Sequence, residues 1–190
     1  MDLIIKSLGW LVYKTMKLFE RLRCKYILSL IKHGENCQIE GFGSFSYNNI
    51  TMGDNVYIGE NCCLISSNAQ IVIGSNVMIS SHAMLASGNH RINVIGELMI
   101  NITEKEINDD KDIIIDDDVW IGMGAIVLKG VHIGRGSVIG AGSILTKDIP
   151  EYSIYTGGFL NKTSKRFNED QLLEHHKILY EKKVIKNEFR

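Results

Sequence analysis

Aliphatic residues recur at every sixth position through the second half of the chain. The frame comprises Ile115, Ile121, Val127, Ile133, Ile139 and Leu145. Small or β-branched residues follow four positions after an aliphatic: Val119, Ala125, Val131, Ser137 and Ser143. A period of six does not keep to one face of a helix with 3.6 residues per turn, and a fixed period indicates a repeat architecture. The pattern therefore predicts a parallel β-helix in which three short strands and three corners, about eighteen residues, make one triangular coil.

The same frame organises the first half of the chain. Its aliphatic residues are predicted to point into the prism, and its small residues to pack beside the next coil. The residue after each aliphatic, such as Gly122, would occupy a corner, where glycine is favoured for its access to positive φ. The frame slips by three residues at 68–70. We expect roughly three coils before residue 90 and two after residue 112, with an irregular first coil over residues 33–51.

Residues 1–32 have the pattern of one long amphipathic helix. One side comprises nine positions at helical spacing: Ile4, Leu8, Leu11, Thr15, Leu18, Phe19, Leu22, Tyr26 and Leu30. Another side carries a basic stripe: Lys14, Lys17, Arg21, Lys25 and Lys32. Two interpretations stay open. The apolar side either packs on the β-helix or a neighbouring subunit, or it attaches the protein peripherally to an anionic membrane surface.

Residues 91–112 interrupt the period of six, so this segment is predicted to loop out from a corner of the prism. The stretch 97–118 contains nine acidic residues and two lysines, Lys105 and Lys111. One interpretation is a solvated acidic loop. The other is a lid or subunit-bridging arm beside an active site, because functional loops are commonly carried by rigid scaffolds.

The coils are predicted to end at Pro150. Asn168, with Gln171 three residues later, has the pattern of a capping box, which indicates a final helix. This helix would cover the open end of the β-helix or dock on a partner. The chain thus divides into an amphipathic helix, a β-helix domain and a C-terminal extension: 1–32, 33–150 and 151–190.

Composition and charge narrow the classes of function. Of the 190 residues, 45% are hydrophobic, 18 are glycine and one is proline, which favours one domain with many tight corners. A net charge of −1 gives no case for nucleic-acid binding. No signal peptide or membrane span is apparent, so we expect a cytoplasmic protein. Four cysteines without CxxC spacing are interpreted as thiols of a reducing compartment: Cys24, Cys37, Cys62 and Cys63.

Three motifs carry a resemblance to a known family: Asp118-Val119-Trp120-Ile121-Gly122, Gly140-Ala141-Gly142-Ser143 and Thr146-Lys147-Asp148-Ile149-Pro150. With them, residues 51–150 resemble the hexapeptide-repeat acyltransferases, in particular the branch of maltose, nodulation-factor, xenobiotic and polysaccharide acetyltransferases. The resemblance implies an all-β core in the form of a left-handed parallel β-helix, with N-terminal and C-terminal helices. The handedness comes from the resemblance alone, because general rules favour right-handed crossovers.

The resemblance also indicates a catalytic histidine. The family places one sixteen residues after a corner glycine, and here Gly74 is followed at that distance by His90. A neutral imidazole can take the proton of a sugar hydroxyl as its oxygen attacks a thioester carbonyl, while a backbone N–H of a facing coil stabilises the oxyanion. Without the motifs, His90 would be interpreted as a surface histidine at the start of a loop. His82 and His132 have coil positions that favour structural or surface roles.

By the same resemblance, several positions match the groove that holds acetyl-CoA as cosubstrate: Trp120, Met123, Ala141, Thr146 and Lys147. Trp120 would lie near the reacting centre, and Met123 stands where the family often has serine. Lys147 is either a phosphate ligand or an exposed corner lysine. The family's usual Gly-Asn-Pro-Ala-Lys segment is missing after residue 156, which leaves Lys162 and Arg166 as candidates for the phosphate end. No metal is expected.

These features predict an acetyl-CoA-dependent O-acetyltransferase acting on a saccharide hydroxyl of a cell-surface polysaccharide or its precursor. Active sites in this family lie between the subunits of a homotrimer, so His90 of one subunit is expected to face the coils from Trp120 to Lys147 of another. The alternatives are N-acylation of an amino sugar or antibiotic, a non-catalytic trimeric scaffold, and a γ-type carbonic anhydrase. The last requires three zinc-binding histidines, usually including His-x4-His, a spacing that is absent from this sequence.

Overall fold

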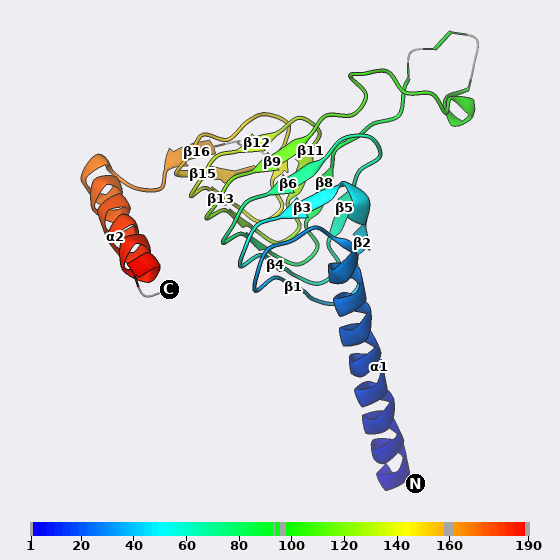
Figure 1. The fold of residues 1–190 in the computed structure, drawn as a ribbon. Helices are drawn as coiled ribbons and strands as arrows, with labels where there is room; N and C mark the ends of the chain where they lie inside the picture. The colour runs from blue at the N-terminus through cyan, green and yellow to red at the C-terminus, as the bar shows by residue number, and fades with distance from the viewer. Residues whose placement is uncertain (1, 93, 96–97, 158–161, 189–190) are drawn as a thin grey trace.

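The computed structural model describes residues 2–92, 94–95, 98–157 and 162–188. Between the helices α1 (Asp2–Leu30) and α2 (Glu169–Glu188), short strands coil into a triangular prism (Figure 1). Each side of the prism is a sheet of stacked strands, and neighbouring strands in these sheets are parallel up to β15. The predicted fold, a left-handed parallel β-helix with a helix at each end, is confirmed.

The three sheets have seven, five and four strands. The seven-stranded sheet contains, in spatial order, β1 (Gln38–Ile39), β4 (Tyr57–Ile58), β7 (Met78–Ile79), β10 (Trp120–Ile121), β13 (Val138–Ile139), β15 (Ser153–Thr156) and the antiparallel β16 (Lys162–Lys165). The five-stranded sheet contains β2 (Ser44–Phe45), β5 (Cys63–Ile65), β8 (Met84–Ala86), β11 (Ile126–Leu128) and β14 (Ile144–Leu145). The four-stranded sheet contains β3 (Ile50–Met52), β6 (Ile71–Ile73), β9 (Ile113–Ile115) and β12 (His132–Ile133). Two 3-10 turns, η1 (Tyr47–Asn49) and η2 (Met99–Asn101), lie outside the sheets.

Strand register confirms the predicted coil length. Trp120 pairs with Val138, which lies one predicted coil length further along the chain. Tyr57 pairs with Met78, which lies three positions beyond one coil length, so the predicted slip is present. Met78 pairs with Trp120, so the chain between these two residues contains one full coil together with the inserted loop. The third coil therefore begins before the loop with β7 and β8 and closes after it with β9.

The repeating aliphatic positions form the core of the prism. All six residues of the frame are at most 1% exposed: Ile115, Ile121, Val127, Ile133, Ile139 and Leu145. The small residues are buried to the same extent, as predicted: Val119, Ala125, Val131, Ser137 and Ser143. Cys24 and Cys62 are buried thiols, and burial raises the pKa of both, which lowers their reactivity as nucleophiles.

The predicted reason for the corner glycines was wrong. Positive φ occurs two residues after the first corner residue, at Gly124 (φ 65°) and Gly142 (φ 67°), and at asparagines such as Asn76 in earlier coils. Gly122 is required for space instead, because a Cβ there would lie 2.6 Å from both the Ile139 oxygen and the Ala141 nitrogen of the next coil. Glycine at the first corner position thus allows the coils to stack closely, and glycine at the third position adopts the left-handed backbone conformation.

The two helices attach to opposite ends of the prism (Figure 1). Only the last turns of α1 contact the first coil, where the Cys24 thiol donates to the Gly41 oxygen at 3.1 Å. The capping box that begins α2 is confirmed, because Asn168 and Gln171 exchange hydrogen bonds of 2.8 and 3.1 Å. His176 of α2 lies 2.6 Å from the Tyr152 hydroxyl, which docks this helix beside the last coil. Neither helix, over the residues described, is both long and apolar enough to cross a membrane.

Candidate active site

The prism has three edges, and each collects the turns that join one sheet to the next. The Met123 edge joins the seven-stranded to the five-stranded sheet and consists of residues 59–62, 80–83, 122–125 and 140–143. The His90 edge joins the five-stranded to the four-stranded sheet and consists of residues 66–70, 87–92, 94–95, 98–112, 129–131 and 146–148. The Asp118 edge joins the four-stranded to the seven-stranded sheet and consists of residues 53–56, 74–77, 116–119, 134–137 and 150–152. The strand order thereby assigns each predicted site residue to an edge.

The two turns of the Met123 edge at 122–125 and 140–143 consist of small residues apart from Met123. Met123 is exposed and stands between Gly122 and Gly124, while Ala141 is exposed between Gly140 and Gly142 in the coil above. A Cβ at Gly124 or Gly142 would meet nothing within 4 Å, so the backbone of these turns is open to the surface. The Gly142 N–H donates to the Met123 oxygen at 2.8 Å, which stacks the two turns. A narrow chain could therefore lie directly against this backbone.

Trp120 lies beside the Met123 edge on the outer face of β10. Its indole is 47% exposed, and its Nε1–H donates to the Ser80 hydroxyl at 3.0 Å. In register it stands between Met78 and Val138 of the neighbouring strands. The hydrogen bond to the preceding coil fixes the indole against the sheet while leaving much of its surface accessible.

His90 lies on a different edge, at the start of the inserted loop. It is exposed, and the preceding Asn89 N–H donates to the Asp109 oxygen at 3.0 Å. Gly88 forms an antiparallel bridge with Asp110, so the outgoing and returning strands of the loop are paired at its base. Thr146 and Lys147 are exposed on this same edge, two coils further along. The structure therefore groups these two with His90 and separates them from Trp120, Met123 and Ala141.

A buried ion pair closes the base of the loop. Lys105 Nζ lies 2.7 Å from Asp110 Oδ1, and the Asp110 side chain is only 5% exposed. Burial alone would raise the pKa of Asp110, but the hydrogen bond from Lys105, backbone N–H donors and the lysine charge together lower that pKa below its ordinary value of 3.8. Lys129 adds hydrogen bonds of 2.9 and 2.8 Å to the Asn108 and Asp109 oxygens. The loop base is thus fixed where His90 leaves the prism.

The remainder of the loop presents apolar side chains to solvent. Four isoleucines are between 76% and 100% exposed: Ile92, Ile95, Ile100 and Ile107. Sequence reasoning concentrated on the acids of this segment and missed both this surface and the Lys105–Asp110–Lys129 anchor. The isolated Lys105 within an acidic stretch was the signal that could have indicated the anchor. Ser87, three residues before His90, is also buried, and its hydroxyl has no partner in the part of the chain that the structure describes.

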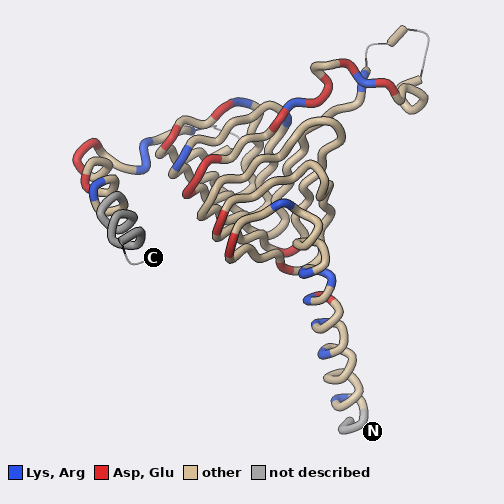
Figure 2. The backbone as a smooth tube through the Cα atoms, viewed as in Figure 1, with Lys and Arg blue, Asp and Glu red and all other residues tan. Residues whose placement is uncertain are grey.

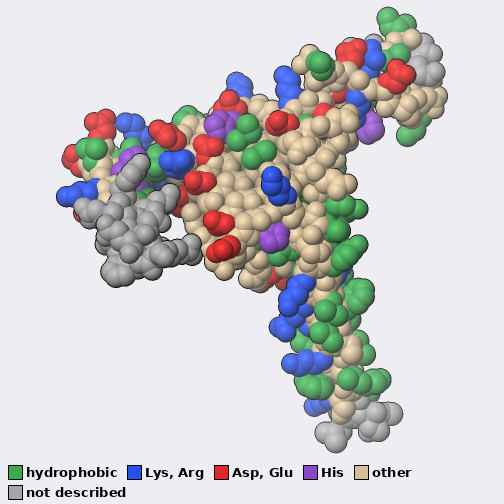
Figure 3. Space-filling view, in the orientation of Figure 1, with side chains coloured by type: hydrophobic (Ala, Val, Ile, Leu, Met, Phe, Trp, Pro, Cys, Tyr) green, Lys and Arg blue, Asp and Glu red, His purple; other side chains and the backbone are tan. Residues whose placement is uncertain are grey.

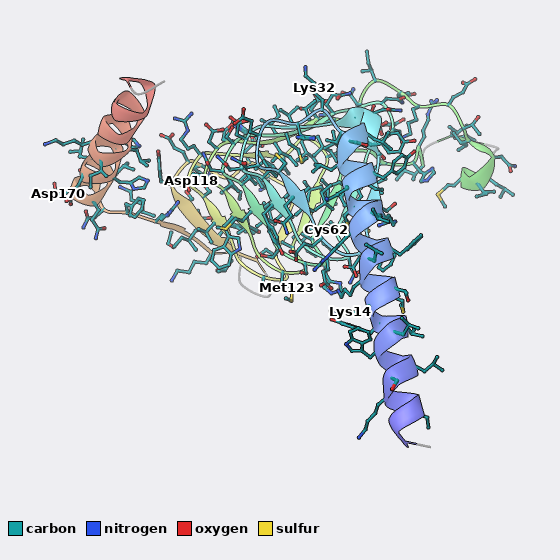
Figure 4. All side chains as sticks on the ribbon, turned by 60° about the horizontal axis from the view of Figure 1, so that its bottom comes forward. Lys14, Lys32, Cys62, Asp118, Met123 and Asp170 are labelled. Carbon is teal, nitrogen blue, oxygen red and sulfur yellow. The ribbon has the colours of Figure 1, made fainter. Side chains whose placement is uncertain are left out.

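The two candidates for a cofactor phosphate have different surroundings. Lys162 begins β16 and pairs in register with Thr156; its side chain is exposed. Arg166 is half-buried and donates to Asp118 Oδ2 at 3.0 Å and to the Gly136 oxygen at 2.7 Å. Asp118 and Met123 are well separated in Figure 4, and the arginine belongs to the Asp118 edge. That edge carries a row of acidic residues, visible in Figure 2.

The described residues contain no group of three or more His, Cys, Asp or Glu side chains that could hold a metal ion. His132 Nε2 lies 3.0 Å from Asp116 Oδ1 on the outside of the prism. His82 adopts positive φ (62°) in a turn of the Met123 edge. These two histidines have the surface and structural positions that the sequence predicted.

Comparison with known proteins identifies the repeats. The family model described as bacterial transferase hexapeptide (six repeats) matches residues 112–147. Residues 112–147 are therefore hexapeptide repeats of this kind. The chain is 44% identical to a chloramphenicol acetyltransferase of Klebsiella aerogenes over 59 residues, 31% of this chain and 28% of that protein. It is 33% identical to a galactoside O-acetyltransferase of Lactococcus lactis subsp. lactis (strain IL1403) over 126 residues, 65% of this chain and 58% of that protein.

A solved structure extends the match to most of the prism. The hexapeptide-repeat acetyltransferase of Vibrio cholerae O1 biovar eltor, complexed with acetyl coenzyme A, has a TM-score of 0.64 and 26% identity, and the match covers 75% of each chain. This chain spans less than two thirds of the length of the two curated relatives above.

Proposed function

We propose that the protein is an acetyl-CoA-dependent acetyltransferase that O-acetylates a saccharide hydroxyl, with His90 as general base. The observation that carries the proposal is the division of the motif residues between two edges of one prism. An exposed histidine stands at the fixed base of a loop on one edge, and bare glycine-rich turns beside an indole stand on the other. The galactoside O-acetyltransferase and the acetyl-CoA complex among the relatives agree with this chemistry.

The proposed chemistry needs a proton acceptor close to the acceptor hydroxyl. Imidazole titrates near neutral pH, so His90 can take the hydroxyl proton as the oxygen attacks the thioester carbonyl, and can return a proton to the leaving thiolate. The Asn89–Asp109 hydrogen bond immediately before it fixes the backbone from which the ring extends. Oxyanion stabilisation is assigned to a backbone N–H of a turn on the facing Met123 edge.

Acetyl-CoA is assigned to the Met123 edge. The open backbone at Gly124 and Gly142 fits a thin pantetheine arm, since none of the described side chains fills that space. Lys147 and Lys162 are exposed and able to meet phosphates. Arg166 fits less well, because its guanidinium already binds Asp118 and the Gly136 oxygen.

The separation of the two edges supports a homotrimer. One protomer presents His90 and Met123 on opposite borders of its five-stranded sheet. In a ring with three-fold symmetry, one surface of each protomer meets a different surface of the next. Such a ring can bring the His90 edge of one protomer against the Met123 edge of its neighbour. The exposed isoleucines of the loop are assigned to this contact, as an arm that bridges subunits and borders the acceptor site.

A second acceptor class has support of its own. The chloramphenicol acetyltransferase of Klebsiella aerogenes is more identical to this chain than the galactoside enzyme is, although over a shorter segment. An antibiotic hydroxyl is therefore the alternative acceptor.

Calorimetric titration of acetyl-CoA into the wild-type protein and His90→Ala, with mass measured by light scattering, tests the proposal. We expect both proteins to bind as trimers. Thiol release in the presence of maltose, a galactoside, an amino sugar, chloramphenicol or a macrolide then identifies the acceptor. A folded trimer that binds no acetyl-CoA would instead indicate a non-catalytic scaffold, and full activity from a stable monomer would contradict the shared site.

A further inference from the structure

The helix α1 exposes an apolar surface that the protein itself does not cover. Eleven large hydrophobic side chains of the helix are between 50% and 65% exposed, and two of them, Trp10 and Tyr13, project from its other side. The remaining nine share one side: Ile5, Leu8, Leu11, Val12, Met16, Leu18, Phe19, Leu22 and Tyr26. At 100° per residue they fall within about half of the helix circumference. We name this set the apolar arc. It extends along most of a helix that, at 1.5 Å per residue, is about 44 Å long.

The way α1 joins the prism turns the apolar arc away from it. The helix packs on the first coil through Cys24 and Leu28, which project from the side opposite the arc, and through Ile27, which lies just beyond one border of the arc. Arg23 fixes the joint by donating to the Gly43 oxygen at 2.7 Å. A groove of about 1010 Å³ separates the helix from the first coil, and its helix side includes Lys14, Lys17 and Arg21 together with Leu18 and Leu22 from one border of the arc. Figure 3 shows hydrophobic side chains along the outer side of α1 and basic ones along the other.

The charge of α1 identifies the kind of surface that it fits. The side away from the arc carries five basic residues: Lys6, Lys14, Lys17, Arg21 and Lys25. Glu20 is the acidic residue among them, and it lies 3.0 Å from Lys17. A half-apolar, half-basic helix lies in the plane of a membrane interface, with its apolar face in the acyl chains and its basic residues at anionic headgroups.

We propose that α1 is an interfacial anchor that binds the protein to an anionic lipid bilayer. A second copy of the helix is the competing occupant of the arc. A coiled-coil seam needs about two apolar positions in seven, with charges of opposite sign beside it. The apolar arc is wider than such a seam, and Lys14, Arg21 and Lys25 make one of its borders basic, so bundled copies would bring like charges together. The lipid surface satisfies both features, and its binding does not depend on the proposed acetyl transfer.

Vesicle flotation of the full-length protein tests the anchor. We expect the wild-type protein to float with vesicles of phosphatidylcholine mixed with phosphatidylglycerol, but not with phosphatidylcholine alone, and to be released by high salt. The triple variant Lys14→Gln, Arg21→Gln and Lys25→Gln should lose about a hundredfold in apparent affinity, because each basic residue contributes roughly fivefold near such a surface. Glutamine keeps the helix propensity of the replaced residues.

A matched control removes three positive charges elsewhere: Lys111→Gln, Arg135→Gln and Lys177→Gln. This control should float like the wild type. The variant Leu11→Gln with Phe19→Gln removes apolar area from the arc, and it should lose vesicle binding while its mass in light scattering stays unchanged. Absence of wild-type binding to anionic vesicles, or equal loss in the control, overturns the proposal. A lower oligomeric mass in the apolar variant would assign the arc to a second copy instead.

Discussion

The Met123 edge and the His90 edge belong to the same coils but are built by different rules. Turns of the Met123 edge have the same length in successive coils, with a small residue first and a left-handed residue third, at Gly124 and Gly142. The His90 edge contains the slip of three positions and, in the next coil, the inserted loop. It also holds the Lys105–Asp110 ion pair.

The difference indicates that the Met123 edge belongs to the repeating scaffold, whereas the His90 edge carries the residue proposed for the chemistry. Regular turns stack because each coil repeats the last, so the Met123 edge offers a uniform backbone surface. The irregular edge interrupts the stacking and holds one histidine in place with contacts that no repeat supplies. If this division is correct, substitution of His90 should mainly lower kcat, and substitution of a glycine on the Met123 edge should mainly lower stability.

The largest effect is expected from the ring of His90. His90→Ala should lower kcat by about 10²- to 10⁴-fold, the usual contribution of a general base, with little change in thermal stability because the ring is exposed. The matched control is His132→Gln, which removes another exposed histidine that contacts only the outer face. Equal loss of kcat in both variants would mean that His90 has no special role.

A methyl group on the Met123 edge should destabilise the stacking. Gly122→Ala places a Cβ 2.6 Å from backbone atoms of the next coil, and overpacking of this kind costs about 1–3 kcal/mol or more. Gly124→Ala meets no atom within 4 Å and only places alanine at positive φ, at about 1 kcal/mol. Denaturant unfolding of the two variants measures the difference. A larger loss at Gly124 would contradict the assignment of Gly122 to coil spacing.

The loop base should respond to acid. The lowered pKa of Asp110 means that its ionised form stabilises the folded loop at pH values above its unfolded pKa of about 4. This contribution is lost as the pH falls through the lower folded pKa. Asp110→Asn should remove it at all pH values and cost about 1–3 kcal/mol locally, because Lys105 loses its partner. Hydrogen exchange of the loop amides between pH 3 and 6 measures this effect. The control Glu104→Gln removes an exposed carboxylate of the same loop and should leave the exchange rates unchanged.

The smallest effects distinguish the two basic candidates. Arg166→Gln should lower stability by about 1 kcal/mol through lost bonds to Asp118 and Gly136, with acetyl-CoA affinity nearly unchanged. Lys162→Gln should leave stability unchanged and weaken acetyl-CoA by a few-fold, the usual scale for an exposed charge pair. Paired unfolding and calorimetric titration would reveal the reverse pattern if Arg166 were the phosphate ligand.

The prism could be predicted from sequence because its period is enforced by packing. An aliphatic residue at every sixth position is buried only if it points into the prism. Ile121 and Val127 therefore predict both where a strand lies and which of its sides faces the core. The corner glycines show the limit of that reasoning. A sequence gives the residue type, but whether Gly122 supplies conformational freedom or space depends on the distance to the coil above, which only the structure provides.

The candidate site was predictable in its residues but not in its arrangement. The resemblance gave His90 and Trp120, yet their assignment to different edges depends on strand order. The Lys105–Asp110 pair lies in a segment without periodicity, so no sequence pattern predicts that these two side chains meet. The direction in which α1 leaves the prism likewise depends on contacts at Cys24 and Arg23, and these decide that its apolar side faces outward.

Complementation between two inactive variants tests the shared site most directly. His90→Ala impairs the His90 edge, and Ala141→Trp fills the Met123 edge of the other chain. If each site combines the two edges from neighbouring protomers of a trimer, co-expression in equal amounts should restore about a quarter of wild-type turnover, because one site in four then has two intact edges. Mixed trimers without any recovery would contradict a site shared between subunits.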